Sequence, residues 1–186
     1  MMAEFKVHTL EDAPEASKPL LEDSQKSFGM VPNLHALMAE SPQVLEAYKT
    51  LSGLFSSTAL TAEERNVVWL AVNVEHNCHY CVPAHTAIAK SQGVSDEVIE
   101  ALRTASPLPD AKLEALRSFT LSVVRNRGVV PDTETEAFFA AGYDQRAVLE
   151  VILGVTHKVL SNYVNHFGQT PIYPAFAKFA WEPRRS

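Results

Sequence analysis

Helix start and stop signals recur along the whole chain, and they constrain its fold more than any other feature. Ser41-Pro42 joins a cap residue to a residue suited to a first helical turn. Thr61–Glu64 has the pattern of a capping box, and Asn77 suits the left-handed position after a helix. Asp144 opens a long stretch with apolar residues at spacings of three and four, and no segment alternates with a period of two. The sequence therefore predicts an all-α fold, a single-domain bundle of seven to nine helices.

The N-terminal part of the chain is less regular than the rest. Pro14 and Pro19 interrupt its pattern, so we expect residues 1–27 to form an N-terminal arm and residues 28–186 to form the helical domain. The 186 residues are 46% hydrophobic and 20% charged, which is enough apolar material for one globular core.

Charge and hydropathy exclude several function classes. The net charge is −6, and an acidic surface repels phosphate backbones, so we expect no nucleic-acid partner. The longest apolar run, Val67–Val72, is far shorter than the roughly twenty residues of a membrane span, so we expect no membrane association. The first residues, Met1–Lys6, lack a basic stretch followed by an apolar one. We therefore expect a cytoplasmic protein, in a compartment where a Cys-x-x-Cys pair is more often redox-active or metal-binding than structural.

The two cysteines of the chain lie in one short segment, Cys78-His79-Tyr80-Cys81. At about 100° per residue, a helical segment would place Cys78, Cys81 and His85 on one face, with Glu75 one turn before Cys78. Pro83 is unfavourable in the middle of a helix, so the helix that carries His85 is expected to begin near Cys78 to Cys81. That start would break helical continuity back to Glu75.

This arrangement suits thiol redox chemistry. A free cysteine is mostly protonated near neutrality, with a pKa of about 8.5, but an imidazole, a helix N-terminus and a second thiol all favour the thiolate. A thiolate can attack the O–O bond of a hydroperoxide and become a sulfenic acid, which the second cysteine converts to a disulfide. Glu75 would accept a proton from His85 or orient a bridging water.

Blander interpretations of the same residues remain open. A structural zinc site takes four ligands. The local candidates are Cys78, Cys81 and His85, with His79 as a further one, and a ligand from outside this segment would have to be His157, His166 or a residue of another subunit. A second alternative is an inert, buried pair. We favour redox chemistry, with neither a metal nor an organic cofactor. His79 would point away from the shared face, and Tyr80 would be a packing residue.

The segment Asn77–His85, preceded by Leu60–Arg65, resembles the AhpD-like / carboxymuconolactone decarboxylase family. Phe28–Asn33 and Asn162–Phe167 are similar to its peroxidase-related branch, and the resemblance extends over residues 28 to 181. It implies an all-α fold, a homo-oligomer that is commonly a trimer or hexamer, and reduction of alkyl hydroperoxides. It also implies that Cys81 is the peroxidatic cysteine.

The same resemblance makes Cys78 the resolving cysteine and places His85 in a proton relay. The sequence departs from the family pattern at two positions. Asn66 stands where the family has a relay glutamate, and Tyr80 stands where it has a histidine before the second cysteine. We consider Glu75, and after it Glu64, as substitutes for the missing glutamate.

The sequence as a whole predicts a cofactor-free thiol peroxidase, or at least a dithiol–disulfide oxidoreductase. Its substrate would be a small hydroperoxide, and a thioredoxin-like or lipoylated protein would reduce its disulfide. One alternative is a non-catalytic helical oligomer module whose cysteine pair senses oxidation or binds metal. A weaker alternative is a carboxymuconolactone decarboxylase-like enzyme, in which the thiol pair would have no purpose.

Overall fold

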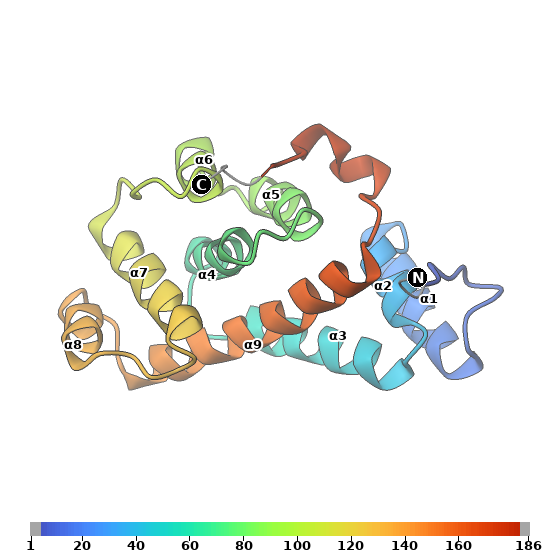
Figure 1. Ribbon diagram of the computed structural model, residues 1–186, viewed down its shortest axis with the longest axis horizontal. Helices are drawn as coiled ribbons and strands as arrows, with labels where there is room; N and C mark the ends of the chain where they lie inside the picture. The colour runs from blue at the N-terminus through green and yellow to red at the C-terminus, as the bar shows by residue number, and fades with distance from the viewer. Residues whose placement is uncertain (1–4, 183–186) are drawn as a thin grey trace.

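The computed structural model describes residues 5–182 and is helical throughout (Figure 1). Residues 5–182 form nine α-helices and two 3-10 helices and contain no strand. In chain order these are η1 (Glu15–Ser17), α1 (Lys18–Phe28), α2 (Asn33–Met38), α3 (Pro42–Ser56), α4 (Ala62–Glu75), α5 (Cys81–Ser91), α6 (Asp96–Arg103), α7 (Ala111–Arg125), α8 (Asp132–Ala140), α9 (Gln145–Gly168) and η2 (Pro174–Phe179). The predicted all-α class is confirmed.

The local start and stop signals of the sequence operate as expected. Thr61 caps α4 by accepting a hydrogen bond from the backbone N–H of Glu64, and the Glu64 carboxylate accepts one from the N–H of Thr61. Asp144 caps α9 in the same way through the N–H of Ala147. Asn77 lies just beyond the end of α4 with a φ of 53°, in the left-handed region. Local side-chain chemistry therefore determines where these helices begin and end.

Helix α4 is the centre of the larger hydrophobic core. It packs against α5, α6, α7 and α9, and the run Val67–Val72 is buried along its whole length. This core continues outward to α8, where Phe138 stacks on Phe119 and Tyr143. Helix α9 crosses the molecule from the α8 end to the α2 end, with α3 alongside it (Figure 1).

A second, smaller cluster of buried apolar residues surrounds the cysteines. It joins the cysteine segment to side chains of α1, α2 and α3, including Leu21, Leu34, Leu45 and Tyr48. The N-terminal segment contributes to this cluster, since Leu21 of α1 is fully buried and the Ser17 hydroxyl donates to the carbonyl of Ala39 at 2.6 Å. Residues 15–27 of the expected N-terminal arm therefore pack closely against the rest of the helical domain. The first four residues of that arm and the last four of the expected domain lie outside the described residues.

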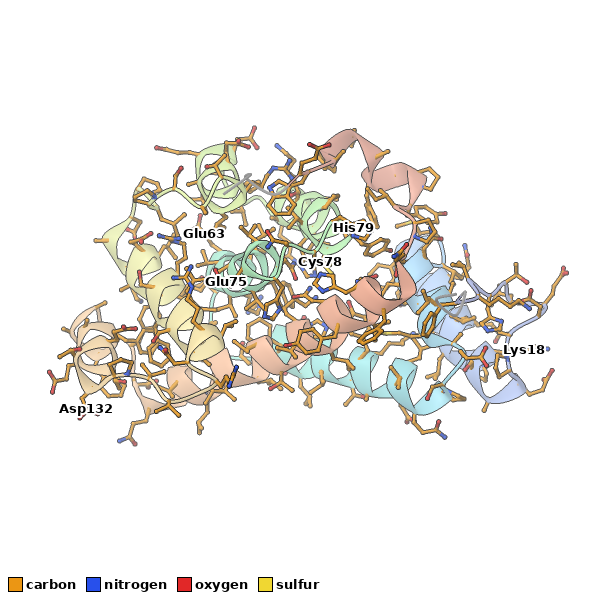
Figure 2. The ribbon with its side chains drawn as sticks, in the orientation of Figure 1. Lys18, Glu63, Glu75, Cys78, His79 and Asp132 are labelled. Carbon is orange, nitrogen blue, oxygen red and sulfur yellow. The ribbon has the colours of Figure 1, made fainter. Side chains whose placement is uncertain are left out.

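The C-terminal segment after α9 folds back over α5. Its 3-10 helix η2 packs against α5, and Arg103 of α6 holds it by donating to the carbonyls of Phe179 and Ala180, each at 3.2 Å. None of the helices in residues 5–182 combines the length and the hydrophobicity of a membrane span. The cysteine segment thus lies between α4, α5 and α9 and beneath η2 (Figures 1 and 2).

Candidate active site

A tight turn between α4 and α5 brings the two cysteine sulfurs together. The turn closes when the N–H of Cys78 donates to the carbonyl of Asn73 at 3.0 Å, with Asn77 in its left-handed conformation. Helix α5 begins at Cys81, as Pro83 in its first turn predicts. The first N–H groups of a helix have no intrahelical partner, and the N–H of Cys81 donates to Sγ of Cys78 at 3.2 Å. Sγ of Cys78 therefore accepts from the first N–H of the helix that carries Cys81 and His85.

The structure makes Cys81 the more acidic of the two thiols. Burial raises the pKa of Cys81, but a hydrogen bond with Cys78, the positive charge of Lys158 and the amides of Asn162 and Asn165 outweigh burial and lower it to about 7. The Asn165 amide donates directly to Sγ of Cys81 at 3.1 Å. Burial and the neighbouring Cys81 raise the pKa of Cys78. Near neutral pH, a substantial fraction of Cys81 is therefore thiolate, whereas Cys78 remains a thiol.

His85 lies one turn after Cys81 on α5, but its hydrogen-bond partner is on another helix. Its Nε2 is 2.7 Å from Nζ of Lys158, which α9 places in the interior with no exposed surface. Burial and the positive charge of Lys158 lower the pKa of His85 well below its ordinary value, so the ring is neutral and accepts from the ammonium. Within residues 5–182, the structure gives His85 no hydrogen bond to Cys81. The expected imidazole–thiol contact is thus replaced by a lysine that interacts with both groups.

A cavity of about 520 Å³ reaches one cysteine and not the other. Its wall includes Cys81, His85 and Lys158, whereas Cys78 is not part of it. Aromatic and histidine rings form much of the remaining wall, from Phe28, His35, Tyr48, Trp69, Tyr80, His157 and Phe176. Cys81 is only 2% exposed, so a small molecule meets it at the wall of this cavity rather than at the outer surface.

The structure does not bring Glu75 to the cysteines. Its carboxylate accepts two hydrogen bonds from Arg125 of α7, both at 2.7 Å, and this pairing lowers the pKa of Glu75. In Figure 2 Glu75 lies on the α7 side of α4, away from Cys78. The expectation of a shared face is wrong because α4 ends at Glu75 and the left-handed Asn77 redirects the chain before Cys78. Helical spacing therefore does not carry across residues 75 to 78.

Glu64, the other candidate carboxylate, and Asn66, which stands at the position of the expected relay glutamate, both make hydrogen bonds to other residues of the chain. Glu64 is held by its capping box and by the Tyr143 hydroxyl, which donates to it at 3.0 Å. The amide of Asn66 donates to the carbonyl of Ala62 and to Gln92, at 2.8 and 2.7 Å. Neither Glu64 nor Asn66 belongs to the cavity wall.

The two residues between the cysteines make hydrogen bonds to other segments of the chain. Nε2 of His79 is 3.2 Å from the carbonyl of Thr170, at the start of the segment that leads to η2 (Figure 2). The Tyr80 hydroxyl accepts from the N–H of Leu34 at 3.3 Å, and its ring packs edge-on against Phe176. His79 and Tyr80 therefore connect the cysteine turn to α2 and to the segment after α9.

Lys158 is the site residue that the sequence analysis missed. A signal for it was present, because buried positions on α9 recur at spacings of three and four, and Lys158 falls within that pattern. The stripe consists of Ala147, Val151, Gly154, Val155, Lys158, Ser161, Asn162 and Asn165. A lysine inside a buried stripe is rare unless it is paired or functional.

The metal-binding alternative has little local support. Within residues 5–182, no three or more His, Cys, Asp and Glu side chains are grouped so that they could hold a metal ion. His157, a possible fourth ligand in the sequence analysis, accepts a hydrogen bond from Nε1 of Trp69 at 3.1 Å. His166 is exposed near the end of α9.

Comparison with known proteins agrees with this fold and with the position of the cysteines. The sequence model of the Carboxymuconolactone decarboxylase family matches residues 42–121, a range that contains Cys78, Cys81 and His85. No curated protein matches the sequence significantly.

Solved structures resemble the chain over nearly its whole length. An alkylhydroperoxidase AhpD core, an uncharacterized peroxidase-related protein from Ralstonia eutropha JMP134, superimposes with a TM-score of 0.83 and 20% identity, covering 95% of each chain. An uncharacterized peroxidase-related protein from Silicibacter sp. TM1040 gives a TM-score of 0.79 and 19% identity, covering 94% of this chain and 93% of that one.

The debrominase Bmp8, in a variant bound to 2,3,4-tribromopyrrole, gives a TM-score of 0.78 and 16% identity, covering 96% of each chain. At these identities the structural likeness shows the fold alone. The family match over residues 42–121 and the shared fold together make this chain similar to AhpD-like proteins and to the carboxymuconolactone decarboxylase family.

Proposed function

We propose that this protein is a thiol peroxidase in which Cys81 reduces a hydroperoxide and Cys78 resolves the product. One observation carries the proposal: the cysteine whose pKa is lowered to about 7 is also the cysteine in the wall of the 520 Å³ cavity. A reactive thiol has to be both ionised and accessible to its substrate. Cys81 meets both requirements, and Cys78 meets neither.

The first step consumes the hydroperoxide. The Cys81 thiolate attacks the terminal oxygen of ROOH, an S–O bond forms as the O–O bond breaks, and RO⁻ leaves and takes up a proton to become ROH. Sulfur is oxidised to the sulfenic acid, and the peroxide is reduced by two electrons. His85 and Lys158 line the same cavity and are 2.7 Å apart, so a hydrogen-bonded pair able to move a proton lies beside the reacting sulfur.

The second step forms the disulfide. Sγ of Cys78 attacks the sulfur of the Cys81 sulfenic acid, an S–S bond forms, and hydroxide leaves with the Cys78 proton as water. The hydrogen bond from the Cys81 N–H to Sγ of Cys78 keeps the two residues adjacent at the start of α5. A dithiol then reduces the disulfide by exchange and becomes a disulfide itself.

Burial of the cysteines bears on the choice of reductant. Cys78 is fully buried, and Cys81 is reached through the cavity. A dithiol on a slender arm, as in a lipoylated protein, can enter such a cavity, whereas a thioredoxin-like protein presents its thiols on a broad surface. We therefore favour the lipoylated class, and reduction rates with free dihydrolipoamide against reduced thioredoxin test the choice.

Cysteine variants test the peroxidase proposal directly. In stopped-flow measurements with cumene hydroperoxide, Cys81→Ser should abolish consumption, because a hydroxyl is not ionised near neutral pH. Cys78→Ser should complete one turnover and leave a sulfenic acid on Cys81 that a dimedone probe traps. Full activity of Cys81→Ser would refute the assignment, and stoichiometric zinc in protein purified without chelator would favour the metal-binding alternative.

A second candidate reaction uses the same dithiol. The debrominase Bmp8 shares the fold, and the aromatic wall of the cavity suits a flat, halogenated ring. In a reductive dehalogenation, two thiols supply two electrons, a C–Br bond becomes C–H, and bromide leaves as the disulfide forms. Bromide release from 2,3,4-tribromopyrrole by the reduced protein would support this reaction over peroxide reduction.

We also propose that the protein assembles into a homo-oligomer through α9. This helix exposes apolar side chains at helical spacing along one face: Leu149, Ile152, Tyr163 and Phe167. A second copy of the chain would cover this stripe with an equally apolar one. Light scattering should give the mass of an oligomer for the wild type and a lower mass for Tyr163→Glu.

A further inference from the structure

Lys158 has a charge that no carboxylate balances. Its side chain is fully buried, and the described residues provide no acidic partner for it, since its hydrogen bond goes to the neutral ring of His85. Its Nζ lies 5.6 Å from the ring centre of Tyr48 and 5.9 Å from that of Trp69. Aromatic faces attract a cation but bear no net charge. An unbalanced ammonium in such surroundings is costly, so a compensating negative charge is expected nearby.

The titratable groups around Lys158 leave one candidate for that negative charge. His157 of α9, His85 of α5 and His35 of α2 are neutral or, if protonated, would add positive charge. Burial raises the pKa of Tyr48, so this hydroxyl stays protonated. Asp23, the carboxylate in the cavity wall, is paired with Lys49 at 2.7 Å. The groups whose negative charge acts on Lys158 are the two cysteines, and Cys81 is the one whose pKa is lowered, to about 7.

We propose that Lys158 is the counter-ion of the Cys81 thiolate and the acid that protonates the departing oxygen of the hydroperoxide. This inference rests on the proposed peroxidase function and assigns its proton donor. In the attack, Cys81 gives an electron pair to the terminal oxygen, and RO⁻ separates. The Lys158 ammonium gives a proton to RO⁻, which leaves as ROH, and the lysine becomes a neutral amine.

Charge balance in the buried site favours this assignment. Before the attack the site holds one negative sulfur and one positive nitrogen, and afterwards it holds a neutral sulfenic acid and a neutral amine. Any other proton source would leave Lys158 charged after its counter-ion has disappeared, and an isolated buried charge is strongly disfavoured. Burial already lowers the pKa of Lys158 to about 8, which suits proton transfer near neutral pH.

His85 has a positioning role in this scheme. Because Nε2 accepts from the ammonium at 2.7 Å, the proton of the neutral ring resides on Nδ1. The ring therefore holds Nζ in the cavity wall without competing for its charge. Asn66, at the position where the resemblance implies a relay glutamate, lies outside the cavity wall, whereas Lys158 is part of it.

Two lysine variants and two oxidants test the proposal. Lys158→Arg keeps the charge but does not give up a proton, and Lys158→Met removes both. Cumene hydroperoxide releases an alkoxide that needs a proton, whereas peracetic acid releases acetate, which does not. Single-turnover rates of the reduced protein should fall about 100- to 1,000-fold with cumene hydroperoxide in both variants. For each variant, the fold decrease of the rate with peracetic acid should be at least 20 times smaller than the fold decrease with cumene hydroperoxide.

The ratio of the two rates cancels any change in the fraction of thiolate or of folded protein. The counter-ion role has its own measurement, the pH dependence of Cys81 alkylation by iodoacetamide. Its midpoint should rise by at least one pH unit in Lys158→Met and stay near the wild-type value in Lys158→Arg.

Equal losses with both oxidants would overturn the acid role, and an unchanged midpoint in Lys158→Met would overturn the counter-ion role. If the wild type reduces neither oxidant, the proposed function fails and the acid role with it. The alkylation midpoints still decide the counter-ion role in that case.

Discussion

The two halves of α9 bury opposite kinds of side chain. The first half places Ala147, Val151 and Val155 in the larger hydrophobic core, and its one buried charged residue, Glu150, is paired with Arg146 at 2.8 Å. There Gly154 fits so closely that an added Cβ would lie 2.6 Å from ring carbons of Phe55. The second half buries polar and charged groups instead: His157, Lys158, Ser161, Asn162 and Asn165. One continuous helix thus joins a dry core to a polar site.

This contrast separates what holds the molecule together from what acts in it. Apolar burial in the first half stabilises the fold at little electrostatic cost. Burial of Lys158 and His157 in the second half, and of the neutral His35 of α2 and His85 of α5 near them, opposes folding unless each group stays in its favoured charge state. We therefore expect mutations in the apolar half to change the free energy of unfolding. Changes in the polar half, or in pH, should alter the pH dependence of stability and of Cys81 alkylation.

The largest expected effect is acid destabilisation that originates in the buried histidines near the polar half of α9. Burial lowers the pKa of His35 to about 3, whereas an unfolded histidine titrates near 6.5. Its contribution to stability is full above pH 6.5 and is lost as pH falls toward 3, because the unfolded chain then binds the extra proton. The loss for His35 alone is about 1.4 kcal/mol per pH unit. His85 and His157, whose pKa values are also lowered, add to it.

Urea unfolding between pH 7 and 5, where most carboxylates stay ionised, measures this slope. His35→Gln keeps a partner for the Ser24 hydroxyl, which lies 2.8 Å from Nδ1 of His35, and should make the slope shallower. A free energy of unfolding that does not change across this window would contradict a neutral, buried His35.

The next largest effect tests the apolar half. Phe138 is 1% exposed, and its ring centre lies 4.1 Å from that of Phe119 and 4.4 Å from that of Tyr143. Phe138→Ala should lower the free energy of unfolding by about 3–5 kcal/mol through lost burial and a cavity. The midpoint of Cys81 alkylation should not move. Phe139→Ala, at a neighbouring position that is 39% exposed, is the matched control and should cost far less.

The sequence predicts local features of this fold well and distant pairings poorly. The capping box at Thr61, the left-handed Asn77 just after α4 and the start of α5 at Cys81 depend on neighbouring residues, and the structure has them as expected. Contacts between helices are different, because helical spacing does not reveal which faces meet. Glu75 pairs with Arg125, fifty residues away, and His85 pairs with Lys158, seventy-three residues away.

A smaller effect lies within the polar half itself. The Asn165 amide donates to Sγ of Cys81, and a hydrogen bond to a charged group contributes about 1.5–3 kcal/mol. Asn165→Leu should therefore raise the pKa of Cys81 by about one to two pH units, seen as a shift in the alkylation profile. No shift would mean that Lys158 and Cys78 alone stabilise the thiolate.

The smallest expected effect comes from Glu75, and it tests whether Glu75 or Lys158 takes part in proton transfer. The Glu75–Arg125 pair is bidentate, but its side chains are 26% and 58% exposed, and ion pairs in contact with solvent contribute at most about 1 kcal/mol. Glu75→Gln should change stability by less than that and leave the rate with cumene hydroperoxide unaltered, as should Arg125→Gln. A relay through Glu75 requires a different pattern, in which Glu75→Gln slows the reaction as strongly as Lys158→Met while Arg125→Gln does not. These variants therefore distinguish the two candidate proton donors, which are Glu75 on the α7 side of α4 and Lys158 in the wall of the cavity.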